Sequence, residues 1–231
     1  MSTTARSRAV TMLSRFGGHD RLAARLLQLT IGLILFGVSV ALMIRARLGL
    51  GPWDVFHQGL AARLGLPFGW VVVAVSVLVL LLWIPLRQRP GVGTVSNALA
   101  VGMVVDATLA VLPTPSSLPL RASFLATGIL ANGVATALYI GAGLGPGPRD
   151  GLMTGLAQRG YSIRLARTCI ELSVFAAGWA LGGSVGVGTL LYAVSIGPLV
   201  HFLLPRLTVP SRPVRSDQAQ IPTAPRCSPS R

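Results

Sequence analysis

The sequence predicts an all-α, polytopic membrane protein with six transmembrane helices, arranged as two inverted three-helix repeats that each contain a short broken or re-entrant helix. Three observations predict this fold. Only 11% of the 231 residues are charged and 52% are hydrophobic, the mean hydropathy is +0.68, and one unusual motif occurs twice. An ordinary soluble domain has about 25% charged residues, so the composition favours a membrane protein.

Apolar runs along the chain are the candidate spans. A helix needs about 17 to 25 apolar residues to cross roughly 30 Å of hydrocarbon. Most of the runs reach this length, and the last lies at the short limit. The first run is longer than the apolar part of a signal peptide and is followed by arginines, so we expect it to belong to the fold. The six runs are 26–44, 68–86, 92–112, 122–143, 169–187 and 189–204.

The duplicated motif reads GLGPWDVFHQGLAAR from Gly49 and GPGPRDGLMTGLAQR from Gly145, with eight of fifteen aligned residues identical. Chance would give about one or two matches. The likeness continues on both sides, since GVGTVSNALAVG from Gly91 returns as GVGTLLYAVSIG from Gly186. Each half is therefore one unit of a span, the motif and two more spans. We place the first membrane repeat at 26–112 and the second at 113–205.

The segment after the first motif, 52–64, has 13 residues. As a helix it would be about 20 Å long, too short to cross, so it lies at a surface or enters the membrane and returns. Each half then has three crossings. Because three is odd, the second half begins on the opposite face, and the repeats are inverted about an axis in the membrane plane.

The basic residues are all arginine and give a net charge of +14. In a soluble protein this charge would suggest nucleic acid, but no basic stretch is interleaved with aromatic residues, so we expect no nucleic-acid partner. With the N-terminus inside, all but four of the twenty arginines are cytoplasmic, which predicts both termini in the cytoplasm. Residues 1–25 form a basic cytoplasmic segment, and 206–231, rich in Pro, Ser and Arg, a disordered cytoplasmic tail. The four outside are Arg45, Arg47, Arg63 and Arg121.

Glycines and a proline precede each motif aspartate. The glycines end the preceding helix and allow a sharp turn, and proline suits the first helical position. Asp54 and Asp150 then fall near the third position, where a carboxylate stabilises a helix N-terminus. That structural role is one explanation; the other is that paired half-helices hold a substrate or ion near the membrane centre. The half-helix motif comprises Gly49, Gly51, Pro52, Gly145, Gly147 and Pro148.

Further polar residues are candidates for a substrate or ion pathway. Gln58 and Thr154 follow the aspartates by four residues and lie on the same helix stripe. An intramembrane acid such as Asp106 costs roughly 2.5 to 3.5 kcal/mol at a helix centre, so it should face protein or water. His57 is more often a local partner of an aspartate than a metal ligand. The candidate set is Asp54, Asp150, Gln58, Thr154, His57, Asp106 and Asn97.

Enzyme signatures are absent from the sequence. GGSVG at 182–186 matches GxSxG only formally, because no strand precedes the serine. Its glycines form, with Gly178, a small-residue ridge for packing within the chain, and a homodimer stays open. Cys169 and Cys227 are too sparse for a thiolate metal site. We therefore expect no enzymatic activity, no cofactor and no metal.

The stretches LGLGPWDVFHQGLA, GLGPGPRDGLMTGL and GVGT followed by IGP resemble the YczE/YyaS/YitT family of bacterial integral membrane proteins, in particular its YczE-like branch. The likeness covers about 29–205. It implies a multi-pass protein of the bacterial plasma (inner) membrane and supplies no catalytic residues.

Two functions fit these observations. The first is a small-molecule permease or exporter with a central site between inverted repeats and, as an option, proton coupling through Asp54 and Asp150. The alternative is a non-transporting membrane factor that recruits or regulates cytoplasmic, biosynthetic enzymes through its arginine-rich loops and tail. The expected partners are the lipid bilayer and a small-molecule substrate whose identity the sequence does not reveal.

Overall fold

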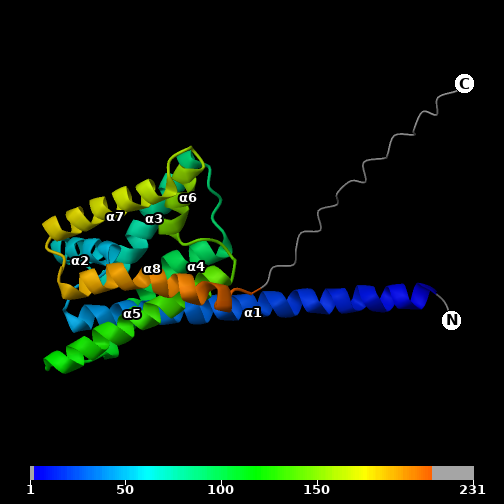
Figure 1. Ribbon diagram of the computed structural model, residues 1–231, viewed down its shortest axis with the longest axis horizontal. Coiled ribbons are helices and arrows are strands. Elements are labelled where there is room, and N and C mark those ends of the chain that lie inside the picture. Colours follow the sequence, from blue (N-terminus) through cyan, green and yellow to red (C-terminus); the bar gives the residue numbers. More distant parts are fainter. Residues whose placement is uncertain (1–2, 210–231) are drawn as a thin grey trace, which may run out of the picture.

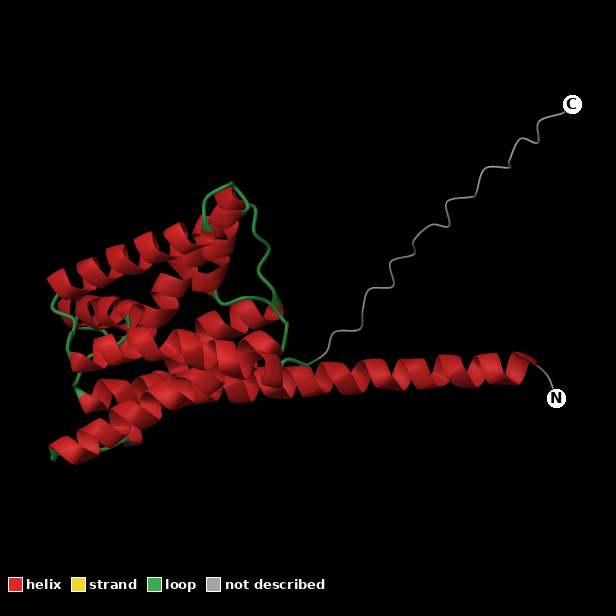
Figure 2. Ribbon diagram, viewed as in Figure 1, coloured by secondary structure: helices red, strands yellow, loops and turns green. Residues whose placement is uncertain are grey.

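The computed structural model describes the backbone of residues 3–209 and the side chains of residues 22–209. This part of the chain is entirely helical, without strands, which confirms the all-α prediction (Figure 2). Figure 1 shows the other helices gathered along the second half of α1, whose first part extends beyond them. The helices are α1 (Thr3–Ala46), α2 (Pro52–Leu64), α3 (Phe68–Leu86), α4 (Val92–Val111), α5 (Leu118–Gly141), α6 (Pro148–Ala157), α7 (Ile163–Ala180) and α8 (Val187–Leu207).

Among the described residues, five helices are long and apolar enough to cross a membrane: Leu22–Ala46 within α1, then α3, α4, α5 and α8. The predicted run 169–187 is wrong in its bounds. The helix there, α7, starts at Ile163 and ends at Ala180, because the following glycines break it, with Gly182 in the left-handed region at φ +96°. The expected glycine ridge is therefore not one helix face.

Two of the predicted segment boundaries do not coincide with helix ends. The boundary at residue 25 falls inside α1, so the basic segment and the first span belong to one continuous helix. The predicted tail begins at 206, but α8 continues to Leu207. Residues 1–2 and 210–231 lie outside the described residues, and with them most of the predicted tail.

Helices α1 and α5 pack along each other. An arginine near the start of each span donates two hydrogen bonds to carbonyl groups at the end of the other helix, so the two helices run in opposite directions. These bonds satisfy carbonyls that a helix end leaves free. Arg25 Nε and Nη2 donate to the Ala142 and Gly143 oxygens (2.6 and 2.8 Å), and Arg121 Nε and Nη2 donate to those of Ala46 and Arg47 (2.8 and 2.7 Å).

Helices α4 and α8 pack against the α1–α5 pair in matching ways. α4 packs against α1, and α8 packs against α5. The backbone N–H of Gly93, at the start of α4, donates to the Leu144 oxygen (2.9 Å), and that of Gly188, at the start of α8, donates to the Leu48 oxygen (2.7 Å). The duplicated sequence thus makes the same contact twice, each time with the turn that precedes the other half's short helix.

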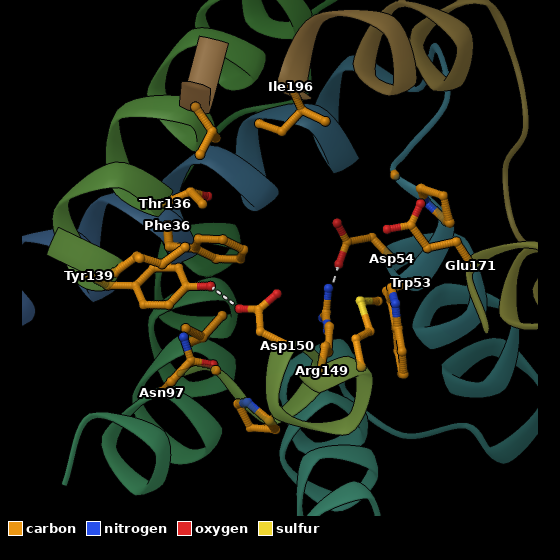
Figure 3. Close-up of a pocket in the computed structure, with 18 of the residues that line it drawn as sticks. Phe36, Trp53, Asp54, Asn97, Thr136, Tyr139, Arg149, Asp150, Glu171 and Ile196 are labelled. Carbon is orange, nitrogen blue, oxygen red and sulfur yellow. Dashed lines mark hydrogen bonds and ion pairs between the residues drawn. The ribbon is translucent and has the colours of Figure 1, made fainter. Parts of the chain in front are cut away.

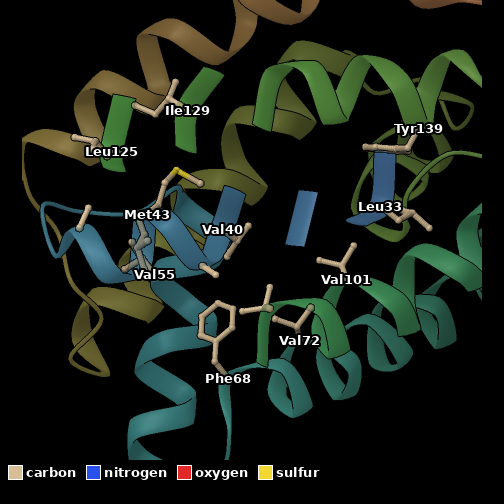
Figure 4. Close-up of a cluster of buried hydrophobic side chains, with 14 of the residues drawn as sticks. Leu33, Val40, Met43, Val55, Phe68, Val72, Val101, Leu125, Ile129 and Tyr139 are labelled. Atoms are coloured by element: carbon tan, nitrogen blue, oxygen red, sulfur yellow. The ribbon is translucent and has the colours of Figure 1, made fainter. Parts of the chain in front are cut away.

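The hydrophobic core is built around α1, where Val40 and Met43 are almost completely buried (Figure 4). Close approach of α1 and α5 depends on glycine, because a Cβ on Gly32 would lie 2.9 Å from the Tyr139 nitrogen and one on Gly128 3.1 Å from the Ser39 oxygen. Helices in lipid associate through such close packing, since burying apolar surface brings little gain there.

Candidate functional site

Each motif makes a sharp turn and starts a short helix. Gly49 and Gly145 have φ of +116° and +126°, a conformation that glycine adopts far more readily than other residues. A Cβ on Gly49 would also lie only 2.6 Å from the Thr189 hydroxyl oxygen, and one on Gly145 2.8 Å from that of Thr94. Helices α2 and α6 begin at the expected prolines, preceded by Gly51 and Gly147 with nearly identical extended conformations.

The N-termini of α2 and α6 open onto one cavity of about 450 Å³ (Figure 3). Its wall includes Gly51, Pro52, Gly147 and Pro148 from the motifs and residues from all eight helices described above. The structure therefore brings the two motifs, 96 residues apart in the sequence, to a common interior space.

The two motif aspartates both line this cavity, but their surroundings differ. Asp150 Oδ2 accepts a hydrogen bond from the Tyr139 hydroxyl at 2.7 Å. The Asp54 side chain is only 6% exposed, and the nearest cationic or ionisable groups to its Oδ1 are Arg149 Nη2 and His57 Nδ1, both at 3.7 Å. These distances are too long for hydrogen bonds. Within the described residues, no group donates a hydrogen bond to Asp54.

Arg149 is a site residue that the sequence analysis missed. The sequence places it among the cytoplasmic arginines but does not single it out, whereas in the structure it lies in the first turn of α6 and lines the cavity. Its guanidinium carbon lies 5.0 Å from the Trp53 ring centroid, while Nη2 faces Asp54. Arg149 aligns with Trp53 in the duplicated motif. The replacement of tryptophan by arginine beside a retained aspartate is the signal that could have identified it.

A second ion pair lies in the cavity wall on α7, where Arg167 Nε and Glu171 Oε1 are 3.0 Å apart. The charged groups of the wall are thus three carboxylates, those of Asp54, Asp150 and Glu171, and two guanidiniums, those of Arg149 and Arg167. Counted in their charged forms, they leave one negative charge without a partner.

The other predicted pathway residues are divided between the cavity and the helix contacts. Asn97 lines the cavity. The other four predicted residues do not line the cavity, and their side chains pack against or bond to other parts of the chain. The Gln58 carbonyl accepts from the Ser184 N–H (2.6 Å), Asp106 Oδ1 accepts from the Gly69 N–H (2.7 Å), the Thr154 hydroxyl donates to the Gly151 oxygen (3.1 Å), and His57 is buried among aromatic rings.

A buried hydrogen-bond chain fixes one aromatic wall of the cavity and was not predicted. The Tyr192 hydroxyl donates to Asn132 Oδ1 (3.0 Å), and Asn132 Nδ2 donates to the Ser39 hydroxyl (2.9 Å). Asn132 and Ser39 are fully buried. The chain links α8, α5 and α1 and holds Tyr192 at the cavity wall. Among the residues described, no group of three or more His, Cys, Asp or Glu side chains is placed to hold a metal ion.

Comparison with known proteins places the chain in a family. Residues 23–205 match the family described as "Family of unknown function (DUF6198)". An uncharacterized protein of Haemophilus influenzae is 41% identical over 181 residues, covering 76% of this chain and 83% of that protein. No solved structure is significantly similar to the chain.

Two Bacillus subtilis proteins are also similar. The uncharacterized membrane protein YczE is 33% identical over 178 residues, covering 76% of this chain and 83% of its own length. The uncharacterized protein YyaS is 27% identical over 182 residues, covering 76% and 90%. The resemblance seen in the sequence is therefore confirmed, and with five apolar helices it indicates a multi-pass membrane location. The chain belongs to the family of unknown function DUF6198 and is similar to YczE and YyaS.

Proposed function

We propose that this protein is a small-molecule permease or exporter of the bacterial plasma membrane that binds its substrate in the cavity between α2 and α6. One observation carries the proposal: two short helices from different parts of the chain direct their N-termini at the same cavity. Transporters use such interrupted helices to hold a substrate or coupling ion near the membrane centre. We do not assign it an enzymatic activity.

The proposal includes two inverted repeats with six crossings and both termini in the cytoplasm. The crosswise bonds of Arg25 and Arg121 and the opposite directions of α1 and α5 support the inversion. Helix α7 would be the sixth crossing. Its Arg167 and Glu171 neutralise each other at the cavity wall, which reduces the cost of placing charged groups at membrane depth.

In this mechanism the short helices position the polar groups and the aromatic wall shapes the cavity. The Asp150 carboxylate is held by Tyr139. The Asp54 carboxylate, without a hydrogen bond from the described residues, is the group with free capacity to accept a proton or a substrate donor. Alternating exposure of the cavity would follow from movement of one repeat against the other.

A flux measurement tests the proposal. Proteoliposomes containing the full-length protein and a trapped pH-sensitive dye would be exposed to panels of amines, carboxylates and neutral solutes. We expect at least one class to cause protein-dependent solute uptake or proton movement, and the double variant Asp54→Asn, Asp150→Asn to lose it. Flux that is unchanged in the double variant would contradict the proposal. A deletion of residues 211–231, which removes most of the basic tail, should leave flux intact. Recruitment of cytoplasmic enzymes by a protein that shows no flux would instead support the alternative function.

A further inference from the structure

We infer that the cavity binds a monovalent organic cation, with an ammonium, amidinium or guanidinium group that occupies the place between Asp54 and Trp53 now held by Arg149. The inference rests on the proposed function, since it names the substrate class of the proposed binding site. It goes beyond that function because the charge and shape of the substrate are inferred from the cavity side chains, whereas the transport proposal rests on the two helix N-termini.

The first observation is the unsatisfied carboxylate. Asp54 has a side chain that is 6% exposed and lines the cavity, yet it accepts no hydrogen bond from the described residues. A buried carboxylate without donors is costly. Asp150, at the equivalent place, has its Tyr139 donor. Asp54 is thus the carboxylate with a vacant hydrogen-bonding capacity, and it faces the cavity.

The second observation is the position of Arg149. Its guanidinium lies 5.0 Å from the Trp53 ring centroid and its Nη2 3.7 Å from Asp54 Oδ1. A cation over an indole face is stabilised by the ring quadrupole. The chain therefore demonstrates, with its own side chain, that a planar cation fits between this ring and this carboxylate. Because the Arg149 side chain is 27% exposed and not within hydrogen-bonding distance of Asp54, a ligand can displace it.

The third observation is the charge balance and character of the wall. Three carboxylates and two guanidiniums leave one unmatched negative charge, which one positive ligand charge would neutralise. Phe36, Tyr139 and Tyr192 add aromatic surface to that of Trp53. A bare metal ion fits poorly, since it needs several oxygen ligands close together, and no such group occurs among the residues described.

Binding of three one-ring probes to the purified full-length protein in lipid nanodiscs tests this inference. Benzamidinium, benzamide and benzoate share a ring and differ in charge, so isothermal titration isolates the charge. We expect benzamidinium to bind at least about tenfold more tightly than benzamide, since a hydrogen bond to a charged group contributes about that much. Benzoate should bind most weakly. Equal binding of benzamidinium and benzamide, tightest binding of benzoate, or no binding of benzamidinium would each overturn the inference.

Variants assign the effect to the two residues. Asp54→Asn should weaken benzamidinium binding about tenfold and remove its preference over benzamide. A cooperative thermal denaturation curve verifies that the variant folds. The matched control Asp106→Asn removes a carboxylate outside the cavity and should change neither the binding of benzamidinium nor this preference. Arg149→Gln should tighten benzamidinium binding, because the internal competitor is gone. A purely structural role for Arg149 predicts weaker binding instead, so that result would overturn the inference.

The binding assay separates this inference from the proposed function. Benzamidinium binding through Asp54, together with no flux of any solute, would contradict the transport proposal and leave the cation site standing. Flux restricted to carboxylates or neutral solutes, together with no preference for benzamidinium, would do the reverse.

Discussion

The two halves of the molecule share the backbone of their motifs but differ in how their last two helices pack. In the first half, α3 and α4 are in close contact: Gly69 and Gly102 lie so near each other that a Cβ on Gly102 would be 2.4 Å from the Gly69 oxygen. In the second half, α7 packs against α2 and α6, and nothing lies within 4 Å of a Cβ on Gly197, which aligns with Gly102. The turns of the two halves are alike, whereas the packing of their last two helices differs.

The same contrast holds at the aspartates. Asp150 accepts a hydrogen bond from Tyr139; the residue aligned with this tyrosine is Met43, which has no donor for Asp54. The cavity between the halves is consequently asymmetric in both packing and polarity. We interpret the first half as supplying the close α3–α4 contact and the Asp54 carboxylate, and the second half as supplying the Arg149 guanidinium that faces it.

The largest expected effect comes from the glycine contact. Gly102→Ala should lower the stability of the protein by about 1 to 3 kcal/mol, because the added methyl group forces α3 and α4 apart. Gly197→Ala, the aligned change, should remain within about 0.5 kcal/mol, since its surroundings are open. Thermal denaturation in detergent measures both. Equal losses of stability in the two variants would contradict the packing difference between the halves.

The next effect concerns Asp106, whose Oδ1 accepts the Gly69 N–H at 2.7 Å in the first turn of α3. Asp106→Ala should cost about 1 to 2 kcal/mol, as for the loss of a helix N-terminal cap. His201, at the aligned position, is exposed, and His201→Ala should change stability by less than about 0.5 kcal/mol. The contrast fails if His201→Ala proves the more harmful of the two in the same denaturation assay.

A smaller effect is expected at Tyr139. Tyr139→Phe removes the hydroxyl that donates to Asp150 and should cost about 1 kcal/mol in stability, making the two aspartates more alike. Tyr161→Phe serves as the control, because Tyr161 is 61% exposed. Denaturation midpoints that are the same for both variants would mean that Asp150 gains nothing from this bond.

The smallest expected difference lies where the halves match. Arg25 and Arg121 make equivalent pairs of hydrogen bonds across the α1–α5 contact, so Arg25→Ala and Arg121→Ala should lower stability by amounts within about 0.5 kcal/mol of each other. The denaturation curves of the two variants give this comparison directly. A clearly larger loss of stability in one variant would show that the Arg25 and Arg121 hydrogen bonds are not energetically equivalent.

Much of the fold follows from the sequence because its signals are local. Glycine and proline determine where α2 and α6 begin, and long apolar runs mark α3 and α4. The predicted bounds of α7 are wrong for two reasons. Arg164 and Arg167 interrupt the apolar pattern in its first turns, so the predicted run starts too late, and the run includes the glycines that follow the helix. The sequence also identifies Asp54, Asp150 and Asn97 as candidate site residues, and all three line the cavity.

The partners of these residues depend on tertiary packing and were not predictable in the same way. Tyr139 reaches Asp150 from another helix, and Arg149 reaches Asp54 across the boundary between the halves. Spacing within one helix placed Gln58 and Thr154 beside the aspartates, but their side chains turn to Ser184 and Gly151 instead. Periodicity gives the face of a helix, whereas the neighbour on that face comes from the folded chain.

The central claim is that the two short helices enter the membrane from opposite sides and meet at one cavity. Leu64, the last residue of α2, and Tyr161, which follows α6, are 57% and 61% exposed. They report on the claim as single cysteines in a chain whose Cys169 and Cys227 are replaced by serine. With a membrane-impermeant maleimide, Leu64→Cys should react in intact spheroplasts and Tyr161→Cys only after lysis. Labelling of both from the same side would contradict the account.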